Sequence, residues 1–97
     1  MNFPKYYAVF FCDGGKWAYY FPGLSINGLG ADFEDAQKMA RGSLAFTLEN
    51  LIADKETIPE PTSRNKVIEI AKADVESGDI SSIWCVELIE AVPDWDN

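Results

Sequence analysis

The chain has 97 residues, a formal net charge of −8 and no histidine. This length fits one domain, and a composition that is 47% hydrophobic and 13% aromatic is too apolar for a disordered chain. The negative charge repels phosphate backbones, so nucleic acid is a poor default ligand and no direct DNA binding is expected. The lack of histidine removes the commonest zinc ligand and the Ser-His and Cys-His nucleophile pairs. We therefore predict a protein that is not an enzyme, with no catalytic residue, cofactor or metal.

The acidic residues gather in the last third of the chain. Those that follow Lys72, with no basic residue among them, are Asp74, Glu76, Asp79, Glu87, Glu90, Asp94 and Asp96. Such a run is more often a solvated face than a binding device, but its field would steer a basic partner. We keep both interpretations.

The start of the chain predicts a cytoplasmic protein with no membrane contact. Residues 1–7 lack the apolar core of a signal peptide, and no window approaches the roughly 18 apolar residues of a membrane span. In that compartment Cys12 and Cys85 are most simply two buried free thiols.

A β-hairpin opens the predicted fold. Residues 6–12 and 17–21 are apolar and aromatic, and the Asp-Gly-Gly-Lys segment between them supplies the positive-φ positions of a tight turn. Residues 24–30 then indicate a short edge strand, in which we take Gly28 and Gly30 as turn glycines.

Two helices and a last strand follow. Asp32 is a good N-cap, and apolar residues recur at three- and four-residue spacing to about Ala53, which predicts one long helix. Ser63 caps a shorter helix that should stop near residues 77–78, after an extended connection rich in proline. The nearly continuous apolar residues in 80–92 predict the final strand.

These elements predict an α+β domain of order β-β-β-α-(α)-β. If the first three strands run up, down and up, the long helix must return down. The last strand then lies parallel to the first and third in a mostly antiparallel sheet, with the long helix on one face. Both faces of the hairpin are apolar, because Trp17, Tyr19 and Phe21 point one way while Ala18 and Tyr20 point the other. Something must therefore cover the second face. The candidates are the shorter helix with the tail, a second copy of the chain, or another protein. We prefer a homodimer or higher oligomer, or a partner, to coverage by the tail.

Two groups of side chains are alternative candidates for chemistry. A metal-dependent nuclease would need Asp13 and Asp35 to converge with Asp32 and Glu34, but a turn and a helix cap already account for these carboxylates. The two cysteines lack the spacing of a redox or metal pair.

The order of motifs resembles the HicB antitoxin family over residues 6–92. The motifs are Tyr7-Ala8-Val9-Phe10, Trp17, Phe21-Pro22-Gly23, Gly30, Phe33-Glu34-Asp35-Ala36, Ala40-Arg41 and Pro59-Glu60-Pro61-Thr62. Two departures are the Gly-Leu-Ser-Ile segment after the Phe-Pro motif and Phe33 in place of leucine. We expect the motif residues to be structural: Trp17, Phe21, Pro22, Gly23, Gly30, Phe33, Ala36, Ala40, Pro59 and Pro61.

The resemblance implies a partial RNase H-like fold with the fourth strand beside the first. It also implies a cytoplasmic antitoxin that silences a small basic HicA-type toxin, a ribonuclease that degrades mRNA. Many members carry a carboxy-terminal DNA-binding segment, which we do not expect here because the sequence ends after the last predicted strand. The alternative is an orphan homo-oligomer of phage or mobile-element origin with no toxin partner.

The residues expected to contact a partner are aromatic or acidic. They are Tyr19, Tyr20, Glu87, Glu90 and Trp95.

Overall fold

The elements follow one another along the chain in the expected order. The computed structural model describes residues 3–92 and contains β1 (Tyr6–Asp13), β2 (Lys16–Phe21), β3 (Ile26–Gly30), α1 (Phe33–Ala53), α2 (Arg64–Ser77) and β4 (Cys85–Ile89). The strands form one antiparallel sheet in the order β3-β2-β1-β4. The α+β class and the fourth strand beside the first are confirmed.

Local signals place the turns and caps where the sequence predicts them. Gly14 and Gly15 have φ values of 59° and 85° in the β1–β2 turn, which favours glycine over any other residue. The Asp32 side chain accepts the Asp35 N–H at 2.7 Å at the start of α1. Ser63 caps α2 in the same way, and α2 ends at Gly78.

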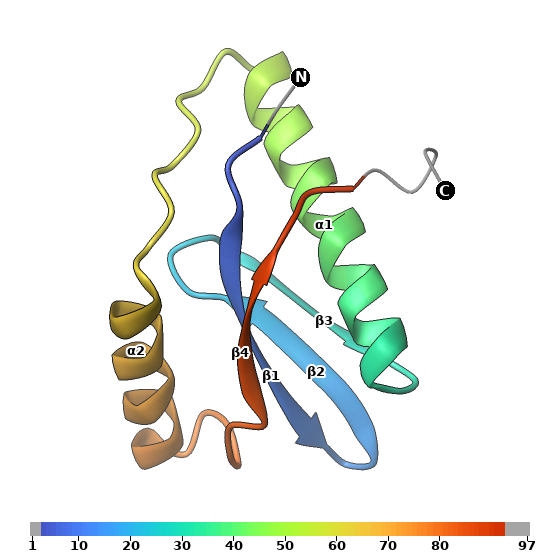
Figure 1. Cartoon of the computed structure of the whole chain (residues 1–97), viewed down its shortest axis with the longest axis vertical. Helices are drawn as coiled ribbons and strands as arrows, with labels where there is room; N and C mark the ends of the chain where they lie inside the picture. The colour runs from blue at the N-terminus through green and yellow to red at the C-terminus, as the bar shows by residue number, and fades with distance from the viewer. Residues whose placement is uncertain (1–2, 93–97) are drawn as a thin grey trace.

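The direction of β4 differs from the expectation. β4 is antiparallel to β1, with Tyr6 opposite Ile89 and Phe10 opposite Cys85. Figure 1 shows the reason: α1 runs back along the sheet, and the extended connection together with α2 then makes a second pass in the opposite direction. The chain therefore enters β4 at the end of the sheet where β1 finishes. The prediction of a parallel last strand is wrong because it counted a single pass between β3 and β4. The RNase H-like arrangement is not confirmed.

β4 is also shorter than the predicted strand over residues 80–92. Ile80 is buried against α2 in a separate cluster instead of extending the strand, and Ser81 and Ser82 are exposed bends or loop. β4 is an edge strand and β1 is its one neighbour in the sheet. Only residues 85–89, which lie opposite β1, therefore form a hydrogen-bonded ladder.

The two helices lie on opposite sides of the sheet (Figure 1). The alternation along β1 and β2 divides the side chains as predicted. One face, which includes Phe10, Tyr19 and Phe21, packs on α1 residues such as Leu44. The other face, which includes Val9, packs on Val67 and Ala71 of α2.

A hydrogen bond links the connection between α1 and α2 to the sheet. The hydroxyl of Tyr6 on β1 donates a hydrogen bond to the Pro59 carbonyl. The burial of this hydroxyl raises its pKa above the ordinary value. This hydrogen bond holds the proline-rich segment that precedes α2 against β1.

Candidate functional site

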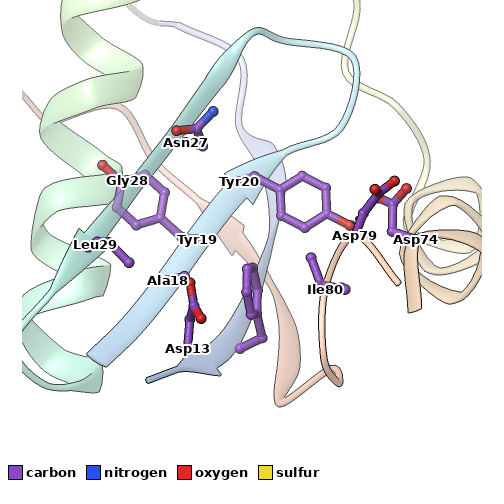
Figure 2. Close-up of a pocket in the computed structure, with 11 residues that line it drawn as sticks. Asp13, Ala18, Tyr19, Tyr20, Asn27, Gly28, Leu29, Asp74, Asp79 and Ile80 are labelled. Atoms are coloured by element: carbon purple, nitrogen blue, oxygen red, sulfur yellow. Dashed lines mark hydrogen bonds between the residues drawn. The ribbon is translucent and has the colours of Figure 1, made fainter. Parts of the chain in front are cut away.

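The second face of the sheet is only half covered. α2 packs on β1 and β4, and no helix of the described residues lies over β2 and β3 on that side. A groove with a volume of about 620 Å³ occupies this half (Figure 2). Its walls are the carboxyl end of α2 with the loop that follows it, and the edge strand β3.

Strand register assembles the floor of the groove. Phe11 pairs with Ala18, and Ala18 pairs with Leu29, so these side chains form one row across β1, β2 and β3. Tyr20 pairs with Asn27 in the next row. Leu29 is 50% exposed, whereas the small Ala18 is buried between its larger neighbours. The result is an apolar floor that is hollow at its centre.

Carboxylates surround this floor. Asp74 at the end of α2 and Asp79 after it line one side, and Asp13 at the end of β1 lines another (Figure 2). Within residues 3–92, the one ion pair closer than 4 Å joins Lys66 to Glu69, so the three groove carboxylates have no such partner. The groove therefore combines apolar surface with uncompensated negative charge.

Tyr20 connects the floor to this acidic wall. Its hydroxyl donates a 2.6 Å hydrogen bond to Oδ2 of Asp74, and its ring meets that of Phe11 edge to face at 6.1 Å. Burial, the hydrogen bond to Asp74 and the charges of Asp74 and Asp79 all raise the Tyr20 pKa well above 10. Tyr20 is thus neutral at physiological pH, and the negative charges of Asp74 and Asp79 disfavour its ionisation.

The structure separates the residues expected to contact a partner. Tyr20 and Tyr19 both contribute to the lining of the groove. The Tyr19 side chain, however, is buried in the α1-side core, where its hydroxyl lies 2.8 Å from that of Ser43. Glu87 is also on the α1 side and accepts a 2.6 Å hydrogen bond from Gln37. Glu90 is exposed beyond β4. Trp95 lies outside the described residues.

Most of the family-motif residues lie in or against the α1 core. Trp17 packs on Phe33 at 5.4 Å and on Trp84 at 5.1 Å between ring centroids. Those that are buried are Phe21, Pro22, Gly30, Ala36 and Ala40. Pro22 and Gly23 form the turn after β2, and Pro59 and Pro61 lie in the connection. They position the sheet and line no part of the groove.

Gly28 and Gly30 are strand residues, which corrects their assignment to turns. A Cβ on Gly30 would lie 2.4 Å from the backbone nitrogen of Ala36, and one on Gly28 would lie 2.4 Å from the Tyr19 hydroxyl. Both glycines therefore permit close packing of β3, against α1 at one position and against the Tyr19 ring at the other.

The cysteines are free, as predicted, but not buried. Cys12 is exposed and Cys85 is half-buried. Burial, with a smaller effect of Glu87, raises the pKa of Cys85 to about 11, so this thiol is protonated at neutral pH.

Metal ligands do not gather in the described part of the chain. No three cysteine or carboxylate side chains in residues 3–92 are placed to hold a metal ion. Asp32 and Asp35 are engaged in capping α1, and the Asp35 carboxylate also accepts the Ala31 N–H at 2.9 Å.

Several groove residues escaped the sequence-based prediction. The sequence identifies Asp74 and Asp79 only as part of an acidic run, and Asp13 only as a turn residue or a candidate metal ligand. Alternation along β3 places Asn27 and Leu29 on the same face as Tyr20. These two groove residues could therefore be predicted once the strand register is known.

Comparisons with models of protein families, with curated proteins and with solved structures give no match to this chain. In residues 3–92, neither helix has the length and apolar character needed to span a bilayer.

Proposed function

We propose that the protein is an antitoxin-like binding module that sequesters a small basic toxin of the HicA type. The observation that supports this most directly is the half-open second face, on which an apolar floor is bordered by Asp13, Asp74 and Asp79. Apolar surface supplies binding energy when it is covered, and unpaired carboxylates favour a partner that brings Lys or Arg.

The overall charge supports the same partner. The chain carries 16 acidic and 8 basic residues, and Asp13, Asp74 and Asp79 line the groove itself. A toxin that degrades mRNA needs a basic surface to bind RNA, and an acidic protein can occlude that surface. Both proteins would then act in the cytoplasm, which makes that location part of the proposal.

Co-expression tests this function. The reading frames beside the gene are searched for a short basic protein, which is expressed alone and together with this chain. We expect the neighbour to arrest growth alone, and we expect this chain to restore growth and to co-purify with it. Failure of the two proteins to form a complex would overturn the proposal.

Self-association is a second candidate, favoured by the uncharged edge strand β3. Residues 26–30 contain no charged side chain, although edge strands of soluble proteins are usually protected by charge. Leu29 within this strand is exposed on the groove side, and the exposed Phe46 of α1 lies near Ile26 and Asn27 on the other side. We expect sedimentation to detect a homodimer or higher oligomer, and a clean monomer at high micromolar concentration would contradict it.

A further inference from the structure

We propose that the groove receives an amphipathic helix from a basic partner protein, which lies along β2 and β3 beside α2. The inference rests on the proposed function for the basic character of the partner. It adds which surface of this chain is used and which element of the partner fills it.

The width of the open half matches one helix. Neighbouring strands are about 4.8 Å apart, so two strands span about 10 Å, close to the 10–12 Å diameter of an α-helix. α2 already covers the other two strands, β1 and β4, on this face. A second helix beside α2 would complete the layer, whereas an extended segment would leave part of the floor exposed.

The floor suits the apolar stripe of such a helix. Ala18 is the smallest side chain in the row and lies between Phe11 and Leu29, which lets a leucine or methionine of the partner enter the hollow. Leu29, half-exposed in the free protein, would be covered. The central position of Ala18 and the exposure of Leu29 make this row the expected centre of the interface.

The charges determine the composition of the partner helix. Asp74 and Asp79 lie on the α2 side of the groove, so Lys or Arg on that flank of the incoming helix can reach them (Figure 2). Asp74 already accepts a hydrogen bond from Tyr20, which holds its carboxylate in place. A second copy of this chain is a poorer occupant of the groove. It also carries a net charge of −8, so the groove carboxylates would repel it.

A designed peptide tests the groove without knowledge of the toxin. The probe is a helical peptide of about 18 residues with leucines on one face and arginines on the flanks, long enough to form a helix on binding. It is titrated into the isotope-labelled full chain and followed by amide chemical shifts. We expect saturable shifts at Ala18, Asn27 and Leu29, and much weaker binding of a peptide in which glutamate replaces arginine.

Matched variants locate the interface. Leu29→Arg puts a bulky charge on the floor at a half-exposed position, and should weaken binding at least tenfold, as loss of a central contact does. Phe46→Arg places the same charge on α1, on the side of the sheet opposite the groove, where Phe46 is 67% exposed and lines no part of the groove. It should leave binding unchanged.

A second pair of variants isolates the role of charge. Asp74→Asn with Asp79→Asn removes two groove charges but keeps oxygens that accept the Tyr20 and Ser77 hydrogen bonds. Glu60→Gln with Glu76→Gln removes two charges at exposed positions outside the groove. We expect the first pair to weaken binding several-fold and to reduce its salt dependence, and the second pair to change it little.

The outcomes separate this inference from the proposed function. Peptide shifts confined to other surfaces, or equal binding by Leu29→Arg and Phe46→Arg, would overturn the groove assignment. If a neighbouring toxin co-purifies equally well with Leu29→Arg, the function stands and the groove assignment fails. If the peptide binds the groove but no neighbouring protein forms a complex, the groove assignment stands and the antitoxin function fails.

Discussion

The hydroxyl of Tyr20 joins strand β2 to helix α2 through Asp74, and this contact forms one wall of the groove. Sequence alone placed Tyr20 on the second face but could not identify its partner, because Asp74 is far along the chain and belongs to an otherwise solvated acidic run. A hydrogen bond between distant residues depends on how the elements pack, and periodicity carries no information about it.

This contact predicts a loss of stability at alkaline pH. The folded state holds the Tyr20 proton more tightly than the unfolded state, whose pKa is near 10. The stabilisation is therefore complete below pH 10 and is lost as pH rises through the raised pKa of the folded state. We expect the free energy of unfolding, measured with urea, to fall above pH 10.

The Tyr20→Phe variant supplies the control. It should be less stable at neutral pH by about 1.5–3 kcal/mol, the usual contribution of a hydrogen bond to a charged group. Its stability should also decline less steeply above pH 10, because Tyr6 and Cys85 still contribute but Tyr20 does not. Parallel pH profiles for the two proteins would contradict this role of Tyr20.

Gly28 and Gly30 permit a direct comparison within one strand. An added methyl at Gly30 meets the backbone of Ala36, which cannot move without displacing α1, whereas one at Gly28 meets the Tyr19 side chain. Overpacking costs about 1–3 kcal/mol and more where the neighbour cannot yield. We expect Gly30→Ala to lower the melting temperature more than Gly28→Ala, and the reverse order would contradict the contact between β3 and α1.

At the scale of elements, α2 determines both the topology and the site. Its N-cap at Ser63 and its end near residues 77–78 agree with the sequence-based prediction. Its effect on the direction of β4 was missed, because the extended connection has no periodicity that reveals how far it travels. A segment of this kind can reverse the sense of the following strand without leaving a pattern in the sequence.

The cap of α2 offers a test of this element. The Ser63 hydroxyl accepts the Lys66 N–H at 3.3 Å, and replacing a serine cap by alanine costs about 0.5–2 kcal/mol. We expect Ser63→Ala to destabilise the protein by about 1 kcal/mol in urea unfolding. Thr62→Ala, at the residue before the N-cap, is the matched control and should have a smaller effect.

At the scale of the molecule, a charge of −8 acts on the whole fold. Within residues 3–92 the one ion pair is exposed, so the acidic excess is not offset by close contacts. Like charges repel one another in the compact state, and salt screens this repulsion as the Debye length falls from about 30 Å at 0.01 M to about 3 Å at 1 M.

We therefore expect the melting temperature to rise when sodium chloride is increased from low to moderate concentration. Lys66→Gln, which adds net negative charge, should enlarge this rise, whereas Glu69→Gln should reduce it. Both residues belong to the same exposed pair, so loss of that pair affects the two variants equally. A melting temperature that is independent of salt would show that self-repulsion is negligible.

The sequence predicted the class, the order of the elements and the division of side chains between two faces. It did so because the hairpin turn, the helix caps and the alternation along β1 and β2 are local signals. The groove depends on where α2 stops and on what remains open beside it. Only the three-dimensional packing of Asp79, Ile80 and Leu29 around Ala18 reveals that space.

The pairing of Tyr6 with Ile89 has a consequence for the order of folding. The β1–β2 hairpin and β3 join neighbouring stretches of chain, whereas the β1–β4 ladder closes a loop that includes nearly every other residue of the domain. Closing a loop of this length lowers the conformational entropy of the chain before the contacts of β4 contribute any stabilisation. β4 should therefore dock last and detach first, and its amides should exchange with solvent faster than those of β2.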